Sequence, residues 1–281
     1  EVNQLLEQFL EYLRTSRKVT SNTLVSYEQD LRQFGNFLID ENLWDFSLIT
    51  EEKIHEFLNL LKKNGKSPAT LSRMLVSIRS IFAYLVKEEV LETNPAHFIH
   101  QPQVKRKPPE ILSEDEIVIL LKQPDATSAK GIRDKAMLEL MCATGVTVSE
   151  LLNLCFEDLN FKETTICCKG DDKERTLPVH DGAFVYLEKY LLQSRAVLLA
   201  QKESDVFFLN CQGRPMTRQG FWKIVKQYGE KAGLKGDLTP ATIRNSFAAH
   251  KSHHGANLQQ IQQLMGHARR SSTEIYTQLD Y

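Results

Sequence analysis

Two adjacent prolines, at positions 108–109, constrain the fold of this chain most, because helix is disfavoured at and just before a proline. They lie in the stretch QVKRKPPE, and helical patterns occur on both sides of it. The sequence therefore predicts an extended linker over residues 101–111, between a domain at residues 1–100 and a second at residues 112–281. The linker is basic, with three consecutive cations: Lys105, Arg106 and Lys107. Such a cluster either contacts a polyanion or is only a solvated surface.

The composition is that of a globular protein with two ordinary domains. The 281 residues are 42% hydrophobic and 25% charged, which is enough apolar material for two cores. No uninterrupted apolar run approaches the roughly 20 residues of a membrane-spanning helix. The start, EVNQLLEQFL, has neither the basic nor the apolar region of a secretory signal. The five cysteines include no C-x-x-C pair, so we expect reduced thiols and a cytoplasmic location.

The charge is unevenly distributed along the chain. The formal net charge is only −1, which by itself argues against a polyanionic partner. However, residues 205–281 hold ten Lys or Arg and five Asp or Glu, a net of +5, which leaves −6 for the preceding 204 residues. A binding face needs local charge, so the C-terminal region is the candidate for contact with a nucleic acid.

The first domain is predicted to be a small helical bundle. Apolar residues recur every three or four positions, as on one face of a helix, at Leu24, Tyr27, Leu31, Phe34 and Leu38 and again at Leu71, Leu75, Ile78, Ile81 and Leu85. Ser21 is the expected N-cap of the first of these helices, and Ser67 caps the second, with Pro68 at its first position. Two further helices are expected near residues 2–14 and 51–63.

The second domain is also predicted to be mainly helical. Ser113 and Glu116 have the spacing of a capping box, and Gly145 ends the helix GIRDKAMLELMCATG. Thr217 and Thr239 are expected to cap two later helices. The stretch ATGVTVSELL reads as a helix end, a glycine turn and the start of a new helix. This arrangement can orient the side chain of Thr147 toward a substrate.

One segment of this domain has a β pattern. In TTICCKGDDKERTLPV, β-branched and small apolar residues flank a Gly-Asp-Asp turn, which predicts a hairpin. Three cations are placed near its tip: Lys169, Lys173 and Arg175. A phosphate contact is the expected role of this cluster. The fold class is therefore mainly α, two helical domains with one small β-hairpin.

Several dispersed motifs together resemble the Xer-type tyrosine recombinases, a phage-integrase-like family. They occur in the family's order and cover nearly the whole chain: LSEDEI, ATGxxVSELLxL, CKGDDKERTLPV, LTPxTIRxSFAAH and LMGHARRSSTEIYT. The resemblance implies a helical core-binding domain, a linker and a catalytic domain that enclose a DNA duplex. It also implies cleavage through a 3′-phosphotyrosine with a free 5′-hydroxyl, without a metal or cofactor.

The resemblance assigns a role to five residues. Tyr276, in SSTEIYT, matches the nucleophile, and Arg244, in TIRNSF, matches the second of two arginines that clamp the phosphate. His267 matches a hydrogen-bond donor to the same phosphate. Lys169 matches the general acid for the 5′-oxygen, and Glu150 matches an acidic residue that orders the site. Such chemistry needs a hydroxyl nucleophile beside cations that neutralise the phosphate oxygens.

Three positions depart from the family's pattern. Thr147 stands where the resemblance implies the first clamping arginine, and Ala241 stands where it implies a histidine. Asn245 replaces a histidine often seen directly after Arg244. Removal of one preorganised donor typically slows a reaction by about 10²–10³. We therefore expect impaired cleavage, which leaves open whether the chain is an enzyme or a non-catalytic regulator or accessory subunit.

Three explanations for these departures compete. The chain has diverged to a DNA-binding protein with weak or no strand cleavage, or the residues were changed deliberately. Alternatively, another cation compensates for Thr147, and the candidates are Arg133, Lys173 and Arg175. The sequence does not separate these explanations.

The expected partner is double-stranded DNA with a specific site, bound by a homo- or hetero-oligomer that is a tetramer on two duplexes in the family. The candidate phosphate contacts are Lys105, Arg106, Lys107, Lys173, Arg175, Arg214, Arg218, Lys223 and Arg244. The candidate base readers in the first domain are Ser72, Arg73 and Arg79. DNA binding rests on many dispersed phosphate contacts, so it is retained when one catalytic residue is lost.

A metal site is the alternative of a different class. His250, His253 and His254 have a spacing that can place two imidazoles on one metal ion. No carboxylate or cysteine lies in a convincing partner motif, so no metal is predicted.

Overall fold

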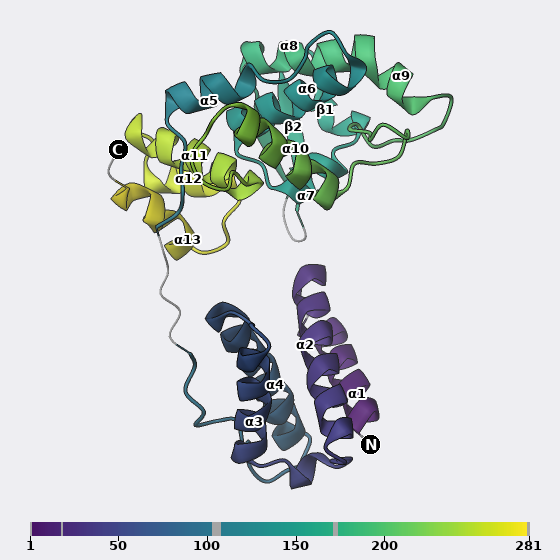
Figure 1. Cartoon of the computed structure of the whole chain (residues 1–281), viewed down its shortest axis with the longest axis vertical. Coiled ribbons are helices and arrows are strands. Elements are labelled where there is room, and N and C mark those ends of the chain that lie inside the picture. Colours follow the sequence, from purple (N-terminus) through teal and green to yellow (C-terminus); the bar gives the residue numbers. More distant parts are fainter. Residues whose placement is uncertain (1, 18, 103–107, 171–173, 280–281) are drawn as a thin grey trace. The chain divides into compact units, whose positions relative to one another are not determined.

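A computed structural model of the chain describes residues 2–17, 19–102, 108–170 and 174–279 (Figure 1). The chain forms two compact units, residues 1–106 and 107–281. The predicted linker includes residues 103–107, which lie outside the described residues.

The first unit is a bundle of helices. They are α1 (Val2–Thr15), α2 (Ser21–Asp40), the short 3-10 helix η1 (Phe46–Leu48), α3 (Glu51–Lys63) and α4 (Pro68–Lys87). Ser67 caps α4 and Pro68 begins it, as predicted. The predicted cap of α2 is wrong by one residue, because Thr20 accepts from the backbone of Thr23 and Ser21 is the first helical residue. The two adjacent hydroxyl residues offer the same chemistry to the helix end.

The helix α4 is the apolar centre of this unit. Among the described helices it alone is long and apolar enough, by length and composition, to cross a membrane. Its stripe is instead buried in the unit's own core, where Leu75, Ile78, Ile81 and Leu85 are fully covered. These contacts are those of a core helix, and they account for its hydropathy.

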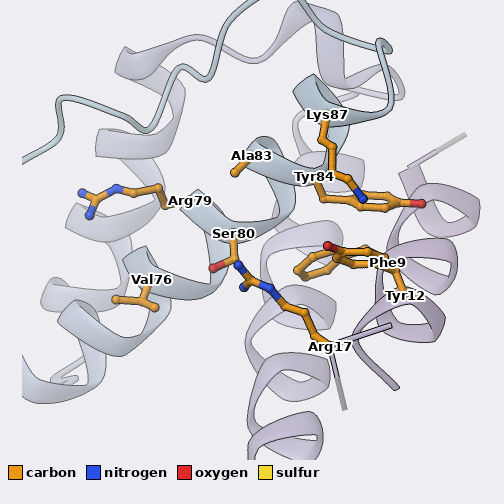
Figure 2. A pocket seen from close by; sticks show the side chains of 9 residues that line it. All are labelled: Phe9, Tyr12, Arg17, Val76, Arg79, Ser80, Ala83, Tyr84 and Lys87. Atoms are coloured by element: carbon orange, nitrogen blue, oxygen red, sulfur yellow. The ribbon is translucent and has the colours of Figure 1, made fainter. Parts of the chain in front are cut away.

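A cavity of about 300 Å³ lies between α1 and α4. Figure 2 shows the rings of Phe9, Tyr12 and Tyr84 beside the cations Arg17 and Lys87. The Lys87 ammonium lies 4.6 Å from the centroid of the Tyr12 ring, within cation–π range. The aromatic residues are thus shared between two helices and hold them together.

The second unit is mainly helical, and α6 contributes many residues to its core. Its helices are α5 (Glu114–Leu121), α6 (Ala129–Thr144), α7 (Val148–Asn153), η2 (Phe156–Asp158), α8 (Asp181–Tyr190), η3 (Leu191–Arg195), α9 (Ala196–Leu199), α10 (Arg218–Lys231), α11 (Pro240–His253), α12 (Leu258–Met265), α13 (Ser271–Glu274) and η4 (Ile275–Gln278). The capping box of Ser113 and Glu116 and the caps Thr217 and Thr239 are confirmed. Gly145 ends α6 in the left-handed conformation, with φ 63°.

The predicted hairpin is part of a small antiparallel sheet. Its strands are β1 (Leu159–Asn160), β2 (Thr165–Lys169) and β3 (Glu174–Pro178), in the order β1-β2-β3. In the register, Cys168 opposes Arg175 and Lys169 opposes Glu174. Lys169 ends β2, and the predicted tip residue Lys173 lies outside the described residues. The β1 strand was not predicted, because two residues are too few to carry a period.

The last helices have a small core of their own. Phe247, Ala248, Ile261, Met265 and Tyr276 form one buried cluster, contributed by α11, α12 and η4. This cluster packs η4 against α11. It therefore determines where Tyr276 lies relative to Arg244.

Candidate active site

Arg244 carries a half-buried positive charge on α11. Its guanidinium donates to the carbonyl oxygen of Gly145, at the end of α6, and to that of Met265 at 2.6 Å, at the end of α12. Burial lowers the pKa of Arg244 below its ordinary value. Both hydrogen-bond partners are neutral carbonyls, and the charge of Glu150 acts on Arg244 without a direct bond, so the guanidinium is oriented without a direct ion pair.

Glu150 and Arg175 form a second element of the site. The two nitrogens of the Arg175 fork donate to both oxygens of Glu150, and the second contact is 3.1 Å. Burial alone would raise the pKa of Glu150, but the bonds from Arg175 and Thr147 hold it below its ordinary value. Both groups therefore stay ionised, and their opposite charges largely cancel.

Thr147 is the N-cap of α7 and forms a capping box with Glu150. Its hydroxyl accepts from the Glu150 backbone N–H at 3.2 Å and donates to Glu150 Oε2 at 2.9 Å. The Glu150 carboxylate in turn accepts from the Thr147 backbone N–H at 2.7 Å. The side chain at this position thus begins a helix and holds Glu150, while it supplies no charge.

Arg175 also lies against the turn that follows α12. Its Nε donates to the Leu264 carbonyl oxygen at 2.9 Å. A Cβ added to Gly266, which has φ 67°, would lie 2.7 Å from Arg175 Nη1. The positive charges of Arg175 and Arg244 both act on His267, directly after this glycine. The turn at residues 264–267 thus brings both guanidinium groups and the histidine into one site.

His267 is neutral at physiological pH. Burial, and then the charges of Arg244 and Arg175, lower its pKa to about 4. Its Nδ1 lies 2.9 Å from Thr273 Oγ1. When the Thr273 hydroxyl donates to Nδ1, the ring proton is on Nε2, and this nitrogen is the donor available to a ligand.

Tyr276 is buried in η4, with 6% of its surface exposed. Its hydroxyl donates to Asn245 Oδ1 at 2.9 Å, and its ring lies nearly parallel to that of His267, with centroids 6.3 Å apart. Burial raises the pKa of Tyr276, and Arg244 opposes this shift in part. The resting nucleophile candidate is therefore a neutral phenol.

Lys169 is bound by two carboxylates. Its ammonium lies 2.5 Å from Glu157 and 2.7 Å from Asp158, both on η2. Hydrogen bonds to Asp158 and Glu157 raise the pKa of this exposed lysine. Sequence reasoning missed these partners, although the signal was present in the adjacent acids of CFEDLNF.

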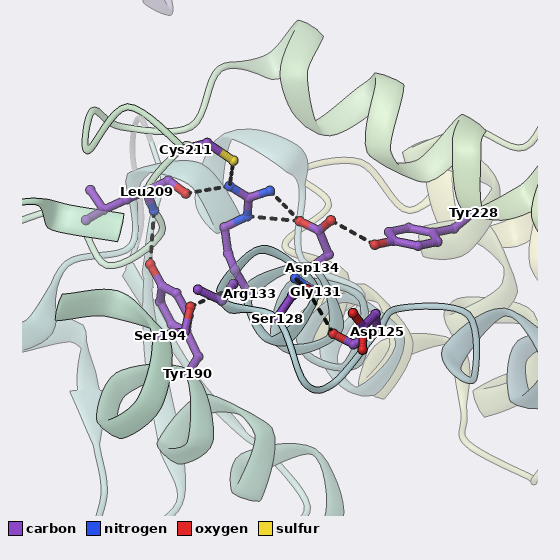
Figure 3. A network of polar contacts seen from close by, with 11 residues as sticks. Asp125, Ser128, Gly131, Arg133, Asp134, Tyr190, Ser194, Leu209, Cys211 and Tyr228 are labelled. Atoms are coloured by element: carbon purple, nitrogen blue, oxygen red, sulfur yellow. Dashed lines mark hydrogen bonds and ion pairs between the residues drawn. The ribbon is translucent and has the colours of Figure 1, made fainter. Parts of the chain in front are cut away.

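Two predicted positions lie outside this group. Ala241 is exposed in the first turn of α11 and has no polar side-chain atom. Arg133 is 1% exposed, and it belongs to a separate network (Figure 3), where it donates to Asp134 Oδ1 and to the Leu209 carbonyl oxygen. Tyr228 donates to the other oxygen of Asp134 at 2.9 Å. The charge of Arg133 is thus balanced by Asp134 within the core.

The other predicted DNA contacts fall into three groups. Arg214 and Lys223 are exposed, and Arg218 is exposed but donates to Ser149 on α7. In the first unit, Arg73 pairs with the buried Asp30 at 2.8 Å, and Arg79 donates to carbonyl oxygens of residues 96 and 99. Ser72 is half-buried. A third group lies outside the described residues: Lys105, Arg106, Lys107 and Lys173.

The histidines at the end of α11 have other partners. His250 Nε2 lies 2.8 Å from the Leu112 carbonyl oxygen, and His254 Nδ1 lies 2.8 Å from the His250 carbonyl oxygen. The rings of His253 and His254 meet edge to face at 5.8 Å. Among the described residues, no group of three or more His, Cys, Asp or Glu side chains could hold a metal ion.

Family models match both units of the chain. Residues 110–281 match the phage integrase family, and residues 6–89 match the phage integrase N-terminal SAM-like domain. The chain belongs to the phage integrase family.

Curated relatives in this family are Xer-type tyrosine recombinases. The chain is 42% identical over 277 residues to tyrosine recombinase XerD of Oceanobacillus iheyensis, covering 97% of this chain and 92% of that protein. It is 41% identical over 278 residues to tyrosine recombinase XerC of Herpetosiphon aurantiacus, covering 98% and 90%. The predicted Xer-type resemblance is confirmed.

Solved structures have the same fold. A pre-cleavage complex of the XerH site-specific recombinase bound to its difH substrate has a TM-score of 0.73 at 22% identity, covering 97% of this chain and 81% of that one. A lambda integrase dimer bound to a COC′ core site has a TM-score of 0.74 at 17% identity, covering 99% and 98%. The predicted mainly helical recombinase architecture is confirmed.

Proposed function

We propose that this chain binds double-stranded DNA at a specific site and cleaves it through Tyr276, at a rate reduced by Thr147 and Ala241. One observation carries the proposal: Tyr276, Arg244 and His267 lie close together where α11, α12 and η4 pack against one another. This grouping combines a hydroxyl nucleophile with a cation and a neutral donor, as attack on a phosphodiester requires.

In the proposed reaction, the Tyr276 oxygen forms a bond to phosphorus and the bond from phosphorus to the 5′-oxygen breaks. The phenolic proton leaves to water, and the 5′-oxygen takes a proton from Lys169. Arg244 binds the phosphate oxygens through N–H groups that its two carbonyl partners leave unused. His267 donates to the phosphate through Nε2.

The reduced rate follows from where the positive charges lie. The Thr147 hydroxyl is bound to Glu150, and Ala241 offers no donor. Of the cations considered as replacements, Arg133 is paired with Asp134 in the core and Arg175 is paired with Glu150. Each missing donor lowers the rate by about 10²–10³, and the losses are not additive because such residues act as a unit.

DNA binding depends on a wider set of groups. Arg214, Arg218 and Lys223 are exposed in the second unit, Arg214 in a loop, Arg218 at the start of α10 and Lys223 within this helix. Cations of this kind position a protein on the phosphate backbone. The XerH and lambda integrase structures contain DNA, and the latter is a dimer. We propose that this chain also binds duplex DNA, and that it does so as an oligomer on its site. We further propose a cytoplasmic location, because the free cysteines suit a reducing environment.

The test is a suicide-substrate assay with nicked duplexes that carry candidate sites. We expect specific binding and a slow covalent adduct that Tyr276→Phe abolishes. The double variant Thr147→Arg with Ala241→His should form the adduct faster. Specific binding without an adduct in either protein would instead identify a non-catalytic regulator or accessory subunit. An adduct that persists in Tyr276→Phe would refute the assignment of the nucleophile.

A further inference from the structure

The hydroxyl of Tyr276 has one hydrogen-bond partner whose role the proposed reaction leaves open. Asn245 lies half-buried on α11, next to Arg244, and accepts from the Tyr276 hydroxyl at 2.9 Å. The two residues come from segments 31 positions apart, and the buried cluster around Phe247 and Met265 holds those segments together. The contact is therefore fixed by packing and is not an accident of an exposed surface.

The amide of asparagine suits both protonation states of a phenol. Its oxygen accepts a hydrogen bond from the neutral hydroxyl, and its NH₂ group donates to an anionic oxygen. A half-turn of the amide group exchanges these atoms within nearly the same volume. A carboxylate of the same shape only accepts when ionised, and an alanine does neither.

We propose that Asn245 is a positioning residue for Tyr276, which accepts from its hydroxyl at rest and, with the amide turned, donates to its oxygen as that oxygen attacks phosphorus. The inference rests on the proposed function, because it assigns Tyr276 the attacking oxygen. Asn245 takes up no proton itself, unlike the histidine expected at this position, so the proton passes to water.

The charges around Tyr276 are consistent with this role. From α11, the Arg244 charge favours the phenolate, and burial opposes it. From the turn after α12, the neutral His267 ring lies parallel to the Tyr276 ring. From α13, Glu274 is exposed and paired with Arg270. A donor from Asn245 thus adds to the charge of Arg244, which stabilises the anionic oxygen.

The decisive variant is Asn245→Asp, which keeps the shape and the acceptor, removes the donor and adds a negative charge. A charged neighbour of this kind shifts a pKa by about 1–3 units. Fluorotyrosine in place of the 8 tyrosines makes the phenols more acidic, so that ¹⁹F NMR follows their titration in the folded protein. Tyr276→Phe assigns the resonance. We expect Tyr276 to titrate at a higher pH in Asn245→Asp than in the wild type.

The same variants are tested for cleavage. Asn245→Asp should shift the rise of the adduct-formation rate to higher pH and lower that rate at neutral pH by about 10-fold or more, in line with a shift of at least one unit. Asn245→His should restore cleavage at neutral pH. The matched control is Asn257→Asp, which adds the same charge but keeps the cap of α12, since aspartate is an equally good N-cap. It should change neither the titration nor the pH profile.

The outcomes separate this inference from the proposed function. An unchanged Tyr276 titration and pH profile in a folded Asn245→Asp protein would overturn the role of Asn245, even with normal cleavage by the wild type. If the wild type forms no adduct, the proposed function fails, while the ¹⁹F titration still reports on the contact between Asn245 and Tyr276. Should Asn245→Asp fail to fold, Asn245→Ala gives the same titration test without the charge.

Discussion

Arg133 is buried and Arg244 is half-buried in the second unit, and of the two only Arg133 forms an ion pair. Two nitrogens of Arg133 donate to Asp134, and the effect of Asp134 raises the pKa of Arg133 despite burial. Arg244 donates to two carbonyl oxygens, and burial lowers its pKa. This contrast indicates that a cation is structural when a carboxylate cancels its charge. The same group can bind an anion when only neutral acceptors hold it.

The largest expected effect comes from breaking the Arg133 pair. Asp134→Asn keeps the shape but leaves the buried guanidinium without its counter-charge, which costs about 3–5 kcal/mol. Urea unfolding measures this loss. Tyr228→Phe is the matched control, because it removes one hydrogen bond to Asp134 and leaves the ion pair, at a cost of about 1 kcal/mol. Equal losses in both variants would contradict a structural charge pair.

The second prediction concerns Arg244. Arg244→Met removes a cation that Glu150 stabilises without a direct ion pair, so the free energy of unfolding should fall by less than in Asp134→Asn. Its main effect should be on chemistry, with adduct formation slowed by about 10²–10³. Unfolding and suicide-substrate assays on one preparation measure both. A loss of stability without a loss of adduct would show that Arg244 is structural, like Arg133.

The third prediction concerns pH and His267, which lies between the charges of Arg244 and Arg175. The unfolded chain takes up the His267 proton near pH 6.5, its ordinary value, whereas the folded chain does so at a pKa of about 4. The unfolded state thus binds more protons in this window, and stability falls as the pH drops from about 6.5 to 4. Glu150, with its lowered pKa, adds a further loss at more acidic pH.

Melting temperatures measured between pH 8 and pH 4 test this dependence. In His267→Asn the fall between pH 6.5 and 4 should become shallower. Identical curves for the variant and the wild type would contradict the lowered pKa of His267.

The smallest expected effect is at Thr147. Thr147→Ala removes the side-chain cap of α7 and one bond to Glu150, and it should lower the free energy of unfolding by about 1 kcal/mol. Thr147→Ser keeps the hydroxyl and should be close to neutral. If the alanine variant is as stable as the wild type, the capping box does not contribute. Thr147→Arg loses the same cap, so its gain in cleavage should come with a similar loss of stability.

The sequence predicted the local features of the fold well. Ser67, Ser113, Thr217 and Thr239 cap helices as expected, because a cap depends on residues only three positions apart. The one shifted cap, Thr20 for Ser21, is a choice between adjacent hydroxyl residues. The hairpin was also predicted, since its turn and both strands lie within sixteen residues.

The contacts that define the candidate site are not local. Arg175 meets Glu150 across 25 positions, and Tyr276 meets Asn245 across 31. No period or cap connects such pairs, so the sequence placed Arg175 among the phosphate contacts and not beside Glu150. Lys169 was likewise predicted as a cation at a hairpin tip, while its two acidic partners on η2 became visible only in the fold.

Gly266, Arg175 and Glu150 form a set of three interdependent positions. Any larger residue at position 266 has to adopt a left-handed backbone and also displace the Arg175 guanidinium, which lies 2.7 Å from where its Cβ would be. A shorter side chain at position 175 would remove the second obstacle but would leave Glu150 without its partner. A change at one of these three positions therefore disturbs the contacts of the others, which links the turn, the arginine and the carboxylate in the divergence of this chain.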